Sequence, residues 1–176
     1  MRYILSWLTF PGIMLHEYGH AWACRQLGIR VVKVCYFRFG NPLGYVLHEQ
    51  PESAVQHIIV ASAPFFVSTV FAFAASMAAT LLVYFQANGA TGDFAPAALA
   101  WLGFSFALHA FPSSGDADAL WKDVTGNSFG FIQKMLLIPV VGLMRMFHFG
   151  SRFWMDALFA ILLIALPPLL LAVYTS

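Results

Sequence analysis

Long apolar stretches limit the fold of this chain more than any other feature of its sequence. Residues 54–86 and 153–174 carry almost no charge, and each exceeds the roughly 18 apolar residues that indicate a bilayer-spanning helix. Of all residues 60% are hydrophobic and 10% are charged, whereas about 25% are charged in an average soluble domain. A soluble core cannot bury so much apolar surface. The sequence therefore predicts an integral membrane protein.

Two further apolar stretches are interrupted by polar clusters. Residues 3–27 contain the sequence HEYGH, and the stretch that begins near residue 94 ends in HAFP. Residues 131–149 are apolar but carry scattered basic residues. We expect an all-α membrane bundle of about four transmembrane helices, with a short interfacial or re-entrant helix at residues 131–149. A single domain is predicted over residues 1–176, with its core at 1–125 and C-terminal helices at 126–176.

Residues 29–50 differ from the apolar stretches around them. β-branched and aromatic residues alternate with polar ones, and Gly40, Asn41 and Pro42 place a turn signal in the middle. Alternation with a central breaker is typical of two paired strands. The sequence thus predicts a small β-hairpin after the first helix, with an irregular loop as the alternative.

The basic residues indicate how the helices are oriented. Lys and Arg concentrate in the short cytoplasmic loops of membrane proteins. If residues 131–149 do not cross the bilayer, Arg2 is alone on one side and the other basic residues lie opposite: Arg25, Arg30, Lys33, Arg38, Lys122, Lys134, Arg145 and Arg152. We therefore expect a multi-pass protein with both termini on the non-cytoplasmic side. A net charge of +1 without a basic run argues against nucleic acid as a partner and leaves the lipid bilayer.

The HEYGH sequence indicates a metal site. His16 and His20 are four residues apart, so a helix places both imidazoles on one face, where they can bind one Zn²⁺ ion. Glu17 lies at the edge of that face and can accept a proton from a zinc-activated water without being a ligand. Ionisable residues within an apolar helix are costly and indicate function. The alternative is a pair of hydrogen-bonded buried histidines with Glu17 as their counter-charge. Two other histidines, His48 and His57, are expected at the membrane surface.

A third zinc ligand has to come from a later segment. His109, Asp116 and Asp118 lie together near a helix break. Asp116 also fits a capping box with Ser113, and Asp118 fits the acidic first turn of a helix. Because the two aspartates are about 200° apart on a helix, only one of them can face the histidines. We predict Asp116 as the ligand, with Asp118 as the alternative; His109 either supports the reaction or bonds to a carbonyl at the helix break.

The segment FPGIMLHEYGHAWACRQLGI resembles the first core helix of the site-2 protease family of intramembrane zinc metalloproteases, and of related small membrane zincins. That family combines an HExxH helix, a β-rich loop proposed to bind substrate as an added strand, and a later helix with an aspartate. Here the same order is HEYGH, the hairpin at 29–50, the stretch 54–86, and HAFPSSGDADAL. The resemblance covers roughly residues 5–125. This chain departs from the family pattern in three respects. Ala follows each aspartate, and His109 stands near the position of a family Asn. The connection between the second and third apolar stretches is also too short for a PDZ-like domain.

The resemblance implies a zinc metalloendopeptidase that cleaves membrane-embedded substrates. His16, His20 and Asp116 would hold Zn²⁺, and Glu17 would act as the general base. The substrate would be a transmembrane protein or peptide in a locally extended form, because a helix keeps its carbonyls in its own hydrogen bonds. Two alternatives belong to other classes: a zinc-binding membrane carrier or sensor without hydrolytic activity, and an inactive structural relative.

Overall fold

The computed structural model describes residues 2–86, 94–126, 130–151 and 153–175. Along this described part the elements are α1 Arg2–Leu8, α2 Phe10–Gln26, β1 Val31–Cys35, β2 Tyr45–His48, α3 Ala54–Gln86, α4 Phe94–Leu108, α5 Ser114–Thr125, α6 Phe131–Ser151 and α7 Met155–Thr175. The protein is mostly helical with one small sheet, as the sequence predicted.

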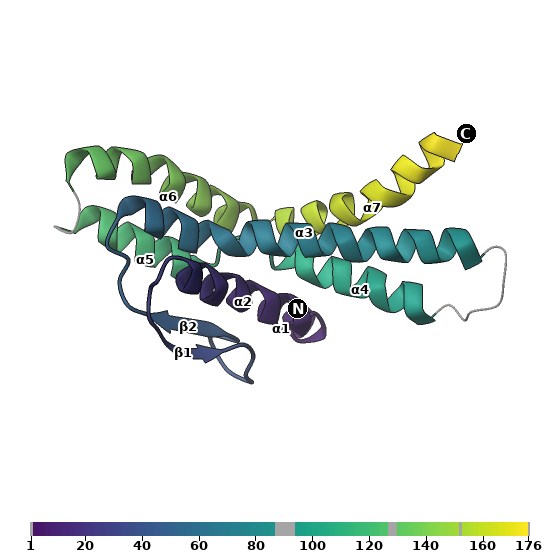
Figure 1. The fold of residues 1–176 in the computed structure, drawn as a ribbon, viewed down its shortest axis with the longest axis horizontal. Helices are drawn as coiled ribbons and strands as arrows, with labels where there is room; N and C mark the ends of the chain where they lie inside the picture. The colour runs from purple at the N-terminus through teal and green to yellow at the C-terminus, as the bar shows by residue number, and fades with distance from the viewer. Residues whose placement is uncertain (1, 87–93, 127–129, 152, 176) are drawn as a thin grey trace.

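Helix α3 forms the long axis of the molecule. Its 33 residues extend over about 50 Å. Helices α2, α5 and α6 lie along its N-terminal half, and α4 and α7 lie along its C-terminal half (Figure 1). The C-terminal end of α7 is therefore at the opposite end of the molecule from the start of α6 (Figure 1).

Three of the described helices are long and apolar enough to cross a membrane: residues Val55–Phe85 of α3, and the whole of α6 and α7. Much of their apolar surface faces outwards, and in α7 the side chains of Ile161 and Leu162 are more than half exposed. Such exposure suits contact with lipid chains better than contact with water. Helix α2 has 17 residues and α4 has 15, fewer than the about 20 that span a hydrocarbon core.

The first apolar stretch is divided in two, whereas the sequence predicted one segment over residues 3–27. Helix α1 ends at Leu8 and α2 begins at Phe10, with Thr9 between them at a ψ of 31°. Pro11 explains the break, because it has no N–H to donate to the carbonyl four residues earlier and is tolerated only in the first turn of a helix. HEYGH therefore lies in a shorter helix than expected.

Residues 131–149 also differ from the expectation of a short helix. They belong to the 21-residue helix α6, whose length and composition permit a crossing. Helices α6 and α7 follow one another in the same direction along the molecule (Figure 1), through a turn in which Trp154 has a φ of 62°. Both helices therefore run toward the same end of the molecule.

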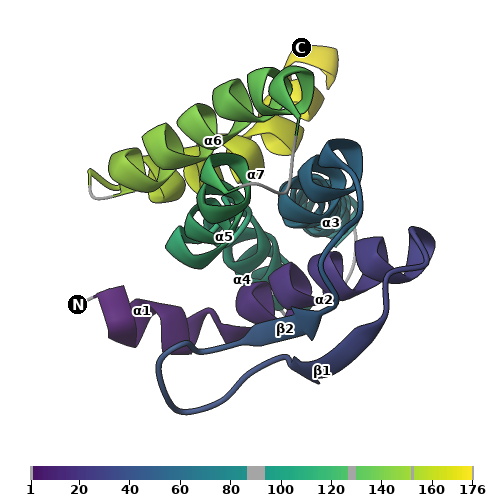
Figure 2. The same ribbon diagram turned by 90° about the vertical axis from the view of Figure 1, so that its left-hand side faces the viewer.

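The predicted hairpin is confirmed. Strands β1 and β2 pair antiparallel, with Cys35 opposite Tyr45 and Val31 opposite His48. The loop between them reaches α1, where the Tyr3 hydroxyl donates a hydrogen bond to the carbonyl of Gly40 at 2.7 Å. Viewed along the long axis, the sheet covers one side of α2 (Figure 2). The hairpin thus lies over the helix that carries HEYGH.

Candidate metal centre

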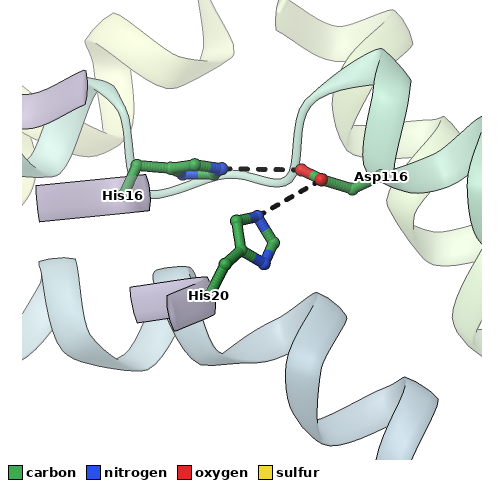
Figure 3. Close-up of side chains that lie close together, drawn as sticks. All are labelled: His16, His20 and Asp116. Carbon is green, nitrogen blue, oxygen red and sulfur yellow. Dashed lines mark ion pairs between the residues drawn. The ribbon is translucent and has the colours of Figure 1, made fainter. Parts of the chain in front are cut away.

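Helix α2 directs His16 and His20 to the same place in the interior. One helical turn separates them, and their ring centroids are 5.0 Å apart. Both are buried, each with 7% of its surface exposed. Both rings point toward Asp116, which comes from α5 (Figure 3).

Two glycines allow α2 to approach its neighbours closely near the histidines. A Cβ at Gly19 would lie 2.8 Å from the Cα of Pro64, so α2 and α3 meet there without room for a side chain. A Cβ at Gly12 would collide with the carbonyl of Ser105 in α4 and approach the ring of His109 to 2.7 Å. Small residues at helix crossings permit such contact between backbones. Helix α2 is therefore held against α3 and α4 together.

One backbone carbonyl orients each histidine. Nδ1 of His16 lies 2.8 Å from the carbonyl oxygen of His109, and Nδ1 of His20 lies 2.9 Å from that of Val60. A carbonyl oxygen can only accept, so each Nδ1 carries the hydrogen and donates it. In the neutral ring the lone pair is then on Nε2. These two Nε2 atoms face Asp116.

Asp116 reaches the histidines from the first turn of α5. Its Oδ1 lies 3.2 Å from Nε2 of His20, and its Oδ2 lies 3.5 Å from Nε2 of His16 (Figure 3). The same carboxylate completes the capping box, since Oδ2 accepts hydrogen bonds from the N–H and the hydroxyl of Ser113 at 2.7 and 2.8 Å. Helix capping and approach to the histidines are thus compatible, because the cap itself orients the carboxylate.

The break between α4 and α5 provides two of these contacts at once. If α4 continued past Leu108, the N–H of Ser113 would bond to the carbonyl of His109. Pro112 precludes this, because the residue before a proline is driven out of the helical region. The Ser113 N–H donates to Asp116 instead, and the His109 carbonyl accepts from His16.

Asp118 points to a different part of the molecule. Its Oδ1 lies 3.3 Å from Nη2 of Arg145 in α6, and its side chain is 65% exposed. The same guanidinium lies over the ring of Trp121, 4.7 Å from its centroid. The structure therefore brings Asp116, and not Asp118, to the two histidines.

The group formed by His16, His20 and Asp116 can hold a metal ion. One ligand atom from each residue lies within 4.8 Å of the other two. Lone pairs on two imidazole nitrogens that face carboxylate oxygens repel each other unless a cation or a proton lies between them. Nε2 of His20 is buried and makes no aligned hydrogen bond to any residue that the structure describes. A metal ion would satisfy this nitrogen and remove the repulsion.

Glu17 lies at the edge of this group, beneath the hairpin. A Cβ at Gly44 would be 2.7 Å from Cγ of Glu17 and 3.0 Å from its Oε1, so the hairpin backbone rests on this side chain. Any larger residue at position 44 would displace the carboxylate. The start of β2 thus restricts where Glu17 can point.

Two cavities meet at Glu17 and Gly44. The strand-side cavity, of about 360 Å³, is lined by His20 and Asp116 together with Tyr45, Val46, His57 and Leu120. The helix-side cavity, of about 580 Å³, is lined by His16 together with Tyr3, Leu43, His109 and Phe111. The candidate metal centre is therefore open on two sides.

His109 contributes its carbonyl to the site, while its ring is directed to the break before α2. The hydroxyl of Thr9 donates to the carbonyl of Leu5 at 2.8 Å, so its oxygen accepts from Nε2 of His109, also at 2.8 Å. The role of the His109 carbonyl as the acceptor for His16 has no signature in the sequence.

Sequence reasoning missed several residues around the site. His57 was expected at the membrane surface, but it is buried and lines the strand-side cavity. Val60 and Gly44 were not singled out either. No local pattern marks these residues, because their roles depend on contacts with α2. Only Pro64, a proline inside a long apolar stretch, gave a local signal that the helix has a free carbonyl.

Comparisons with protein-family models, with curated proteins and with solved structures gave no match for this chain. Its function has to be inferred from the residues of the site.

Proposed function

We propose that this protein is an intramembrane zinc metalloprotease. The observation that carries the proposal is the convergence of His16, His20 and Asp116 at the junction of two cavities, with Glu17 beside them. Two imidazole nitrogens and one carboxylate oxygen are a common ligand set of hydrolytic zinc sites, and they leave the fourth position open. The long apolar helices support a location in the membrane.

Each residue then has a defined role in the hydrolysis. Zinc held by His16, His20 and Asp116 would act as a Lewis acid and lower the pKa of a water molecule towards about 7. Glu17 would accept a proton from the water molecule that attacks the peptide carbonyl carbon. When the C–N bond breaks, Glu17 returns the proton to the departing amine, and the water oxygen remains in the new carboxyl group. The Nδ1 hydrogen bonds keep both imidazoles in the tautomer that this requires.

A substrate has to be extended to reach this site. The strand-side cavity follows the part of β2 formed by Tyr45 and Val46, and the helix-side cavity continues beyond Gly44. Strand β2 pairs with β1 along one edge, so its other edge can pair with a peptide strand. The two cavities would then accept substrate side chains on either side of the cleaved bond.

The order of elements agrees with the resemblance to the site-2 protease family. The HEYGH helix α2 is followed by the hairpin, by the long helix α3, by α4, and by α5, which carries Asp116 in its first turn. The ligand atoms of His16 and His20 in α2 and of Asp116 in α5 lie close together, and this convergence supports the proposal.

The test compares zinc content and cleavage for the full chain in nanodiscs. The probe is a mixture of single-span transmembrane peptides with products read by mass spectrometry. We expect Glu17→Gln to retain zinc and lose cleavage, because the ligands are intact and the base is gone. Glu49→Gln is the matched control, since Glu49 lies in the hairpin with its side chain 57% exposed. His16→Ala should lose zinc and cleavage together.

Other outcomes would contradict the proposal. Zinc binding without cleavage in the wild-type protein would favour the carrier or sensor class. Wild-type protein without zinc would favour an inactive relative that retains only the bundle. Cleavage that persists in Glu17→Gln would exclude Glu17 as the general base.

A further inference from the structure

Helix α3 contains a proline beside the candidate metal centre. Pro64 is fully buried, and its backbone is the surface against which Gly19 of α2 packs. A proline has no N–H, so the carbonyl four residues earlier in the helix loses its usual partner. In α3 that carbonyl belongs to Val60, which is also buried.

The freed carbonyl does not remain unpaired. The Nδ1–H of His20 donates to it at 2.9 Å, across the contact between α2 and α3. Within apolar surroundings a carbonyl released by proline requires such a partner. The requirement of α3 for a donor and the requirement of His20 for an acceptor are therefore met by one bond.

We propose that Pro64 is a positioning residue of the metal centre. By withholding an N–H from Val60, it reserves that carbonyl for Nδ1 of His20 and so keeps Nε2 directed at the metal position. The proposal rests on the zinc site inferred above but not on proteolysis. Pro64 itself does not touch the metal or the substrate.

The same chain contains a matched case away from the site. Pro168 in α7 frees the carbonyl of Ile164, and the Ser76 hydroxyl of α3 donates to that carbonyl at 2.7 Å. Pro64 and Pro168 thus create the same kind of contact between helices. They differ in that only Pro64 acts on a candidate ligand.

The test replaces each proline by alanine in the full chain and measures zinc affinity by competition with a chelator. Alanine restores the N–H that competes for the carbonyl while it keeps the Cα that Gly19 contacts. We expect Pro64→Ala to weaken zinc binding about tenfold or more, the range found when a hydrogen-bond partner of a ligand is lost. Pro168→Ala should bind zinc as the wild-type protein does. In ¹⁵N-histidine NMR spectra, the Nδ1–H of His20 should exchange faster in Pro64→Ala only.

A folded Pro64→Ala with wild-type zinc affinity and an unchanged His20 signal would overturn the proposal. Pro64→Gly restores the same N–H with less bulk and serves as the second variant. If both variants fail to fold, Pro64 is a structural residue and the proposal is likewise overturned. Wild-type protein that binds no zinc would instead refute the metal site, which separates the two failures.

Discussion

Replacing Asp116 or Asp118 by asparagine should have different effects on metal binding and similar effects on folding. The two aspartates are two residues apart on α5, and each substitution removes one negative charge without changing the size of the side chain. Asp116 faces His16 and His20, whereas Asp118 pairs with Arg145. The chemical change is the same in both variants, so a difference between them reports the direction in which each side chain points.

For Asp116→Asn, asparagine retains an oxygen that can accept from Ser113, so most of the cap is kept. The lost charge at the helix N-terminus should lower the free energy of unfolding by about 0.3–1 kcal/mol. Zinc affinity should fall much further. Loss of a residue that only orients a ligand weakens binding about 10–100-fold. Loss of a ligand should therefore cost at least about 100-fold, or about 2.7 kcal/mol.

For Asp118→Asn, only an exposed ion pair is lost. The two side chains are 65% and 48% exposed at a separation of 3.3 Å. Pairs of this kind contribute about 0.2–1 kcal/mol to stability. Zinc affinity and cleavage should stay close to wild type, because this side chain is directed toward α6.

The assay combines zinc competition with thermal unfolding followed by circular dichroism. Zinc loss in Asp118→Asn with retention in Asp116→Asn would refute the assignment of the ligand. Equal loss of zinc and stability in both would mean that the start of α5 has been disrupted as a whole. If neither variant affects zinc, the third ligand is another residue.

Two further predictions follow from the hairpin. Gly44→Ala should retain zinc and lower kcat about tenfold or more, because its Cβ would come within 2.7 Å of Glu17 and displacements near 1 Å can cost about 100-fold in rate. Gly40→Ala is the control, since its Cβ would meet nothing closer than 3.7 Å. Equal cleavage rates in the two variants would exclude steric control of Glu17 by Gly44. The basic residues Arg30, Lys33 and Arg38 predict that the hairpin lies on the cytoplasmic side. In a chain with Cys24 and Cys35 replaced by serine, Asn41→Cys should therefore react with a membrane-impermeant thiol reagent from that side only. Labelling from the outer side would mean that the predicted topology is wrong.

The sequence by itself determined the features that depend on neighbours along the chain. The spacing of His16 and His20 places them on one face of any helix, and the alternation around Gly40 favours a hairpin in any context. The apolar stretch at 54–86 forms a helix over those same residues. The capping box likewise joins two residues, Ser113 and Asp116, that are only three positions apart in the sequence. These patterns are local, so they could be predicted.

The tertiary structure decided what depends on contacts between distant segments. Whether Asp116 or Asp118 faces the histidines is set by the rotation of α5, which packs against α6 and pairs Asp118 with Arg145. The acceptor for His20 is a carbonyl 40 residues away, and Glu17 is confined by a glycine in the hairpin. A helical pattern fixes which side chains share a face, but the direction of that face arises only when the helices pack.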